Sequence, residues 1–224
     1  MFLHGWGCDH KTLMPLINKL KANNMCICFD FFGFGKSKKQ NKPLFLEDYK
    51  KGVIQKLKEL GIAKINILAH SFGARVALMI ASENEVKVEK MFLIGPAGIK
   101  PKFSFKTFCK IKFYKFLKVL SKLHLYPKEK LEKWGSSDYK ILSPTMKKTF
   151  QNVIKVNLKN RLCKITAETF VVIGQNDSQT PVYMGEILQK KIKNCQFKMI
   201  KDAGHFCFLE KTEVGFLACC FFKW

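Results

Sequence analysis

Three polar side chains, far apart in the sequence, have the types that nucleophilic catalysis needs. Ser71 stands in the segment AHSFG, Asp177 in VVIGQND and His205 in DAGH. Each follows an apolar run or a glycine, which is typical of residues just past the end of a buried strand. In this order, serine, aspartate and histidine can act as nucleophile, orienting acid and general base.

The segment around Ser71 predicts an abrupt turn from a strand into a helix. Such a turn requires small residues two positions before and after its apex, because the backbones approach too closely for side chains. Ala69 and Gly73 meet this requirement, although Ala69 replaces the first glycine of the pattern Gly-x-Ser-x-Gly. Ser71 would then expose its hydroxyl above the sheet, beside the free N–H groups of the helix N-terminus. The alternative is that Ser71 serves only as the N-cap of the helix.

Other polar residues near these motifs have simpler interpretations. Asp177 could be a surface turn residue, as the sequence Asn-Asp-Ser often is. We expect His4 and His70 to pack loops rather than to catalyse, and Asp202 to form a turn. Asp30 is expected to fix the glycine loop that follows it.

Two glycine-rich loops accompany these residues. The loop HGWG at residues 4–7 can aim a backbone N–H into the same pocket as Ser71. The loop GFGKS at residues 33–37 imitates the end of a phosphate-binding loop, but Asp30 occupies the place of that motif's first glycine. A carboxylate there would repel phosphate, and the third glycine of a dinucleotide site is missing. We therefore predict that the site uses no cofactor.

The order of apolar and amphipathic segments predicts a mostly parallel sheet flanked by helices. Short β-branched and aromatic runs alternate with longer amphipathic stretches, which is the pattern of an α/β fold. We expect strands at residues 25–29, 65–69, 90–94, 169–173 and 196–200, and helices at residues 12–22, 46–60, 73–82, 182–191 and 206–221.

Residues 98–160 interrupt this alternation, because no convincing strand lies within them. We interpret them as a helical cap inserted into an α/β core of residues 1–97 and 161–224. Pro96-Ala97-Gly98 before the insertion marks a plausible border, since proline and glycine punctuate elements.

The predicted cap is basic and amphipathic. Eleven lysines and two acidic residues lie between Lys100 and Lys133, interleaved with aromatic residues. We expect the apolar stripe containing Phe113 and Phe116 to roof the catalytic pocket while the lysines face water. The alternative is a weak contact between this helix and an anionic membrane.

Composition narrows the remaining classes of partner and compartment. The 224 residues fit one domain, and the net charge of +23 would allow a nucleic-acid partner. However, only Arg75 and Arg161 among 40 basic residues are arginines, and lysine lacks the planar fork that reads bases, so we predict no specific nucleic-acid binding.

No apolar run reaches the roughly 18 residues of a membrane span, and no signal peptide is recognisable, which favours a cytoplasmic protein.

The cysteines do not indicate a disulfide framework or a metal site. There are nine of them, an odd number, and no two are spaced as Cys-x-x-Cys. We expect small buried side chains in a reducing compartment.

With Ser71, Asp177 and His205 in this order, the sequence resembles the α/β-hydrolase superfamily over nearly its whole length. The HGWG loop is similar to that of small capped, esterase-like serine hydrolases. The resemblance implies a mostly parallel sheet with Ser71 at a nucleophile elbow and the other two residues after later strands. It also implies an oxyanion hole formed by the backbone N–H groups of Trp6 and Phe72.

The resemblance sets a further expectation for the N-terminal region. Family members have two more strands before the one that ends at the His-Gly motif, whereas three residues precede His4. We expect these N-terminal strands to be missing, through a late start, a truncated copy or a compensating arrangement, with a short central strand and a less precise Trp6 donor.

The implied activity is cofactor-independent hydrolysis of a small, apolar carboxylic ester or thioester through an acyl-enzyme. Serine rather than aspartate at the elbow argues against dehalogenase and epoxide hydrolase chemistry. Two alternatives stay open: a carbon–carbon bond hydrolase with the same triad, and a non-catalytic binding or membrane-surface module that keeps the fold.

Overall fold

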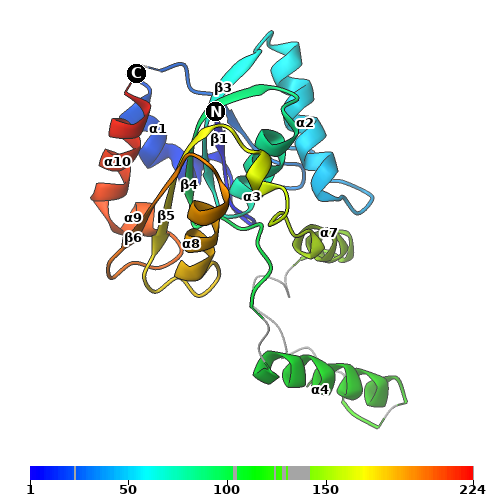
Figure 1. The fold of residues 1–224 in the computed structure, drawn as a ribbon. Coiled ribbons are helices and arrows are strands. Elements are labelled where there is room, and N and C mark those ends of the chain that lie inside the picture. Colours follow the sequence, from blue (N-terminus) through cyan, green and yellow to red (C-terminus); the bar gives the residue numbers. More distant parts are fainter. Residues whose placement is uncertain (23, 103–104, 124, 128–129, 131–141, 224) are drawn as a thin grey trace.

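The central feature of the molecule is one six-stranded parallel sheet (Figure 1). The computed structural model describes residues 1–223 except 23, 103–104, 124, 128–129 and 131–141. The strand order β2-β1-β3-β4-β5-β6 confirms the predicted α/β fold. The strands are β1 (Phe2–Leu3), β2 (Cys28–Phe29), β3 (Lys64–His70), β4 (Lys87–Ile94), β5 (Glu168–Gly174) and β6 (Cys195–Ile200).

Helices cover both faces of this sheet. One face packs against α1, α9 and α10, and the other packs against α2, α3 and α8. In Figure 1, α1 and α10 lie together on one side of the strands, with α2, α3 and α8 on the other. The helices are η1 (His10–Leu13), α1 (Met14–Leu20), α2 (Leu46–Glu59), α3 (Phe72–Glu83), α4 (Phe105–Lys122), α7 (Pro144–Lys155), η2 (Leu162–Lys164), α8 (Val182–Lys191), α9 (Cys207–Glu210) and α10 (Thr212–Phe222).

Burial on both faces explains the apolar composition of the central strands. In β4, Met91 and Leu93 join the core under α2, α3 and α8, whereas Phe92 and Ile94 join the core under α1, α9 and α10. Because successive strand side chains point to opposite faces, a strand covered on both sides must be apolar at nearly every position. Because the strands are parallel, the carboxyl ends of β3, β5 and β6 lie at the same edge of the sheet, where polar residues can gather.

Most predicted elements are confirmed, and two differ for identifiable reasons. The predicted strand 25–29 is reduced to β2, because its neighbour β1 offers only two paired residues, and Met25 is largely exposed. The predicted helix 206–221 is divided at Lys211, whose backbone is extended. The Glu210 carboxylate at the end of α9 accepts a hydrogen bond from the Gly204 N–H at 2.8 Å, which ties α9 to the preceding loop.

The predicted insertion contains α4 and α7, and the described part of residues 98–160 contains no strand. Helix α7 begins with Pro144 after the N-cap Ser143, whose hydroxyl accepts the Met146 N–H at 3.2 Å. In Figure 1, α7 lies close to the core, whereas α4 lies well apart from it. The division into a core and a cap stays a prediction.

The expectation that the cysteines are buried is wrong for most of them. Cys207 is buried, but Cys109, Cys163 and Cys220 are exposed and the other five are half-buried. Cys109 and Cys220 lie on outward faces of α4 and α10, where a short side chain gains little from the core. Within the described ranges, no helix combines the length and apolar character needed to cross a bilayer.

Candidate active site

Ser71 occupies a sharp, strained turn between β3 and α3. Its backbone has φ 51° and ψ −110°, a conformation that non-glycine residues rarely adopt. The turn is held by the Ser71 N–H, which donates to the carbonyl of Ile94 at 2.9 Å. A Cβ at Gly73 would lie 2.2 Å from the carbonyl oxygen of Leu3, so only glycine fits there. The requirement for a small residue two positions after the serine therefore comes from the approach of β1.

The side chains of Ser71, His205 and Asp177 form one hydrogen-bonded chain. His205 Nδ1 lies 2.7 Å from Asp177 Oδ2, and His205 Nε2 lies 2.9 Å from Ser71 Oγ. A carboxylate oxygen can only accept, so Nδ1 carries the proton of the neutral ring. Nε2 then presents its lone pair to the Ser71 hydroxyl, which donates to it. The structure thus brings together the three residues that the sequence singled out.

Asp177 is buried and held as an anion. Its Oδ1 accepts the backbone N–H groups of Gln179 and Thr180, each at 2.8 Å, and its Oδ2 accepts the Thr180 hydroxyl at 2.7 Å. Burial alone would raise the pKa of Asp177, but the hydrogen bonds from His205 and Thr180 outweigh it and lower the pKa. The carboxylate is therefore ionised at neutral pH.

His70 contacts both the backbone and the imidazole ring of His205. Its Nε2 lies 3.0 Å from the backbone carbonyl of His205, so Nε2 must carry the proton and donate. The two imidazole rings lie 4.8 Å apart. Burial, and next the nearby His205, lower the pKa of His70 to about 3, which keeps the ring neutral. His70 therefore packs against the loop that carries His205, and it adds a donor role that the sequence did not reveal.

The two residues expected to form the oxyanion hole, Trp6 and Phe72, line the same cavity as Ser71. Phe72 begins α3, so its N–H points out of the first turn of the helix. The loop after β1 lies against the elbow, because a Cβ at Gly5 would be 3.5 Å from the Ser71 Cβ. The Trp6 ring packs edge-on against Phe72 and Phe34, with centroids 5.4 Å and 4.9 Å away. This packing fixes the backbone of the loop beside Ser71.

A cavity of about 630 Å³ opens over the Ser71 hydroxyl. Helix α7 supplies one wall of it through Phe150, Val153 and Ile154. The expectation that Phe113 and Phe116 roof this pocket is wrong: both side chains are exposed, and none of the described lining residues belongs to α4. The reason is that α4 lies apart from the core (Figure 1), whereas the end of α7 is bound to α3 through Arg75. The described lining residues are Gly5, Trp6, His70, Ser71, Phe72, Arg75, Ala97, Ile99, Pro101, Leu142, Phe150, Val153, Ile154, Gln179, Thr180, Met184, His205 and Phe206.

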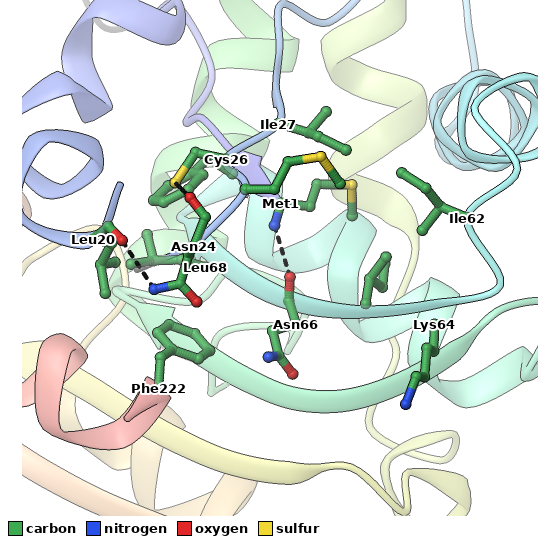
Figure 2. Close-up of a pocket in the computed structure, with 13 residues that line it drawn as sticks. Met1, Leu20, Asn24, Cys26, Ile27, Ile62, Lys64, Asn66, Leu68 and Phe222 are labelled. Atoms are coloured by element: carbon green, nitrogen blue, oxygen red, sulfur yellow. Dashed lines mark hydrogen bonds between the residues drawn. The ribbon is translucent and has the colours of Figure 1, made fainter. Parts of the chain in front are cut away.

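A second, smaller cavity of about 150 Å³ lies at the opposite, amino-terminal edge of the sheet (Figure 2). Figure 2 shows the Met1 amino group donating to the Asn66 carbonyl there, at 2.8 Å. None of its described lining residues is a serine, histidine or aspartate. Because ligands of open α/β sheets bind beyond the carboxyl ends of the strands, the cavity at Ser71 is the better candidate site.

The other polar residues near the motifs have structural roles. Asp30 accepts the backbone N–H groups of His10 and Lys36, at 2.7 Å and 2.9 Å, and so fixes the following glycine loop as expected. Asp202 lies in a turn with φ 49°, also as expected. In the described part of the chain, no group of three His, Cys, Asp or Glu side chains is arranged to hold a metal ion.

Two pocket residues, Thr180 and Arg75, were not identified from the sequence. Thr180 follows Asp177 by three positions, a spacing typical of a capping turn that could have indicated its contact with the carboxylate. Arg75 follows Ser71 by four positions, which places both on one side of α3.

Similarity to known proteins agrees with this architecture. Residues 1–125 match the family model described as alpha/beta hydrolase fold. A pimeloyl-[acyl-carrier protein] methyl ester esterase from Legionella pneumophila (strain Paris) is 25% identical over 227 residues, covering 96% of this chain and 90% of the relative. A 2-hydroxy-6-oxononadienedioate/2-hydroxy-6-oxononatrienedioate hydrolase from Pseudomonas putida is 26% identical over 236 residues, covering 93% of this chain and 79% of the relative. Among solved structures, an alpha/beta hydrolase enzyme from a Medee basin deep-sea metagenome library has a TM-score of 0.77 at 19% identity, covering 100% of this chain and 88% of that one.

Proposed function

Because this chain belongs to the α/β-hydrolase fold family, we propose that it is a serine hydrolase that cleaves carboxylic esters or thioesters with Ser71, His205 and Asp177 as its catalytic triad. The observation that carries the proposal is the pair of hydrogen bonds at His205, 2.9 Å to Ser71 and 2.7 Å to Asp177. These distances lie within the range in which a general base removes a proton from its nucleophile.

The first half of the reaction forms an acyl-enzyme. His205 Nε2 accepts the Ser71 hydroxyl proton while Oγ attacks the carbonyl carbon of the ester. Asp177 stabilises the imidazolium that results, because its ionised carboxylate accepts the Nδ1–H. The protonated Nε2 then donates its proton to the leaving alcohol or thiol, and the acyl group stays on Oγ.

The second half returns the enzyme to its starting state. A water molecule donates a proton to His205 as it attacks the acyl carbonyl, and Ser71 leaves with that proton. In both halves we propose that the N–H groups of Phe72 and Trp6 stabilise the tetrahedral oxyanion. One donor of this kind typically contributes about 3 kcal/mol to transition-state stabilisation.

The walls of the cavity support a small, largely apolar acyl group. Ile99, Val153, Ile154 and Met184 contribute aliphatic surface near the Ser71 hydroxyl. The Legionella relative is named for the hydrolysis of a methyl ester, in agreement with this chemistry. The Pseudomonas putida relative is a hydrolase of oxo-dienedioates, so carbon–carbon bond cleavage with the same three residues is the second candidate.

Labelling by a fluorophosphonate probe tests whether Ser71 is an activated nucleophile. We expect rapid labelling of the wild-type protein at Ser71, located by peptide mass, and none in Ser71→Ala. Hydrolysis of p-nitrophenyl esters should fall by about 10,000-fold or more in that variant, since nucleophile and base act as a unit. A wild-type protein that neither reacts with the probe nor hydrolyses any ester would instead be the non-catalytic module.

We also propose that α4 contacts an anionic membrane surface. Three apolar side chains on one side of α4 are more than half exposed, namely Phe105, Phe116 and Val119. Their separations in the sequence are close to whole numbers of helical turns. The sequence of α4 contains six lysines and no acidic residue, so negative charge is the complementary partner. Its N-terminal connection includes Ile99 and Pro101, which line the catalytic cavity.

A further inference from the structure

Arg75 is a buried cation in the wall of the catalytic cavity. Its side chain is only 7% exposed, and among the described residues no carboxylate forms an ion pair with it. Burial lowers the pKa of Arg75 to about 10, which still leaves the guanidinium charged at neutral pH. A charge removed from water in this way is unfavourable unless a partner compensates it.

The hydrogen bonds of Arg75 account for one nitrogen of the guanidinium. Nη1 donates to the backbone carbonyls of Val153 and Val156, at 3.0 Å and 2.6 Å. These carbonyls belong to the C-terminal end of α7, where unpaired acceptors and the negative end of the helix dipole favour a cation. Arg75 thus joins the helix that carries Ser71 to the helix that forms a wall of the cavity.

The opposite edge of the guanidinium remains available to a ligand. No partner for Nε or Nη2 is found in the part of the chain that the structure describes. Among the described residues, His70 Nδ1 is the one side-chain nitrogen or oxygen that is both fully buried and without a hydrogen-bond partner. Because Nε and Nη2 of Arg75 also lack partners, neither of these two atoms is fully buried. The Nε and Nη2 edge presents two parallel N–H groups, which is the geometry that binds both oxygens of a carboxylate.

The surroundings of Arg75 favour an anion within the cavity. No aspartate or glutamate is among the described lining residues, and Arg75 is their one permanent charge. Arg75 lies one helical turn after Ser71, and its N–H donates to the Ser71 carbonyl at 3.2 Å. Because Ser71 and Arg75 line the same cavity, an acyl chain whose ester carbonyl lies at Ser71 can extend toward the guanidinium.

We propose that Arg75 binds a carboxylate at the far end of the acyl chain, so that the preferred substrates are half-esters of dicarboxylic acids. This inference rests on the proposed hydrolase function and adds the substrate class. The apolar walls would enclose the methylene chain, and the charge-assisted hydrogen bonds to Nε and Nη2 would fix its free end.

A matched set of substrates tests this specificity without altering the protein. The mono-p-nitrophenyl esters of the diacids from succinate to suberate are compared with neutral p-nitrophenyl esters of the same carbon number. At the chain length that reaches Arg75, we expect kcat/KM of the half-ester to exceed that of the neutral ester by about 10-fold to 100-fold. Preference for the neutral ester at every length would overturn the inference while leaving the hydrolase function intact.

Variants then assign the preference to Arg75. The measured quantity is the ratio of kcat/KM for half-ester to neutral ester within each variant, because a general loss of activity cancels in it. We expect the ratio to fall by about 10-fold or more in Arg75→Met and by less in Arg75→Lys, which keeps the charge but not the fork. Arg161→Met is the control, since Arg161 pairs with Glu83 outside the cavity and should leave the ratio unchanged. An unchanged ratio in Arg75→Met would overturn the inference.

A binding measurement separates this inference from the proposed reaction. Calorimetric titration of Ser71→Ala with monomethyl adipate requires no turnover. We expect binding that weakens by about 10-fold or more when Arg75→Met is added, and much weaker binding of the uncharged dimethyl ester. Equal affinities for the charged and uncharged esters would contradict the role of Arg75, whatever the activity of the wild-type protein.

Discussion

The imidazole of His70 donates from Nε2 to the backbone carbonyl of His205 at 3.0 Å, although 135 residues separate the two in sequence. The residue before the nucleophile thereby holds the loop that carries the proposed base. His70 is only 1% exposed, so water cannot replace this donor. The position of His205 relative to Ser71 depends in part on this one contact.

Removing the donor of His70 should lower kcat more than it changes KM. In His70→Leu, the carbonyl of His205 loses its partner and the ring of His205 loses a neighbour 4.8 Å away. We expect kcat for a p-nitrophenyl ester to fall by about 3-fold to 10-fold, the range of one neutral hydrogen bond. His70→Gln, which restores an N–H donor, should recover most of this loss. Equal activity of the two variants would show that the hydrogen bond does not position the base.

Replacing Asp177 by asparagine should reduce kcat by about 10,000-fold, because an amide donor favours the wrong tautomer of His205. Thr180→Val removes the hydroxyl that shares Oδ2 of Asp177 with His205, at 2.7 Å. We expect the smaller loss of about 3-fold to 10-fold there, and Thr180→Ser should behave like the wild type. Steady-state kinetics on one ester measures all three, and a tenth or more of wild-type activity in Asp177→Asn would argue against its role as orienting acid.

Acidification should destabilise the protein partly through His70. Its pKa is lowered from 6.5 to about 3 in the folded protein, chiefly by burial, so the unfolded chain binds an additional proton between these values. The free energy of unfolding should therefore fall as the pH drops from about 6.5 toward 3, by up to about 1.4 kcal/mol per pH unit from this group.

Urea denaturation over this pH range measures the effect of His70. The slope of unfolding free energy against pH should be smaller in His70→Gln than in the wild type. Some slope should remain, because burial also lowers the pKa of His4. Parallel curves for the two proteins would show that His70 contributes nothing to the pH dependence.

Exposed aromatic residues of α4 should govern binding to vesicles. Phe116→Ser removes apolar surface from a side chain that is 58% exposed, so folding should be unaffected. We expect co-sedimentation with vesicles containing phosphatidylserine to weaken by about 3-fold or more, and neutral phosphatidylcholine vesicles to bind little.

The matched control for this experiment is Phe216→Ser on α10, because Phe216 is 67% exposed but lies on another helix. It should bind vesicles like the wild type. Equal co-sedimentation of the wild-type protein with anionic and neutral vesicles would contradict the membrane contact. Binding of α4 to an acidic protein, without binding to anionic vesicles, would assign the helix to a protein partner instead. Added salt should weaken an anionic contact, since lysine charges are screened.

The sequence alone determined the order of strands and helices and the turn at Ser71. These depend on local rules: apolar runs of strand length, amphipathic stretches of helical length, and the small residues that a tight turn requires. Helix α8 begins and ends at the residues expected for it. The nucleophile motif is recognisable because Ala69, Ser71 and Gly73 lie within a few residues of one another, although the contact that requires glycine at position 73 comes from Leu3 of β1.

The tertiary structure decided which distant groups meet. Adjacent pairing of β3, β4, β5 and β6 places the loops that carry Asp177 and His205 beside Ser71. The bond from His70 to a carbonyl of the His205 loop, and the contact of Arg75 with the end of α7, leave no periodic trace in the sequence. Periodicity reports that a face is buried, but not which element covers it. For this reason the sequence pattern points to α4, whereas the structure places α7 at the wall of the cavity.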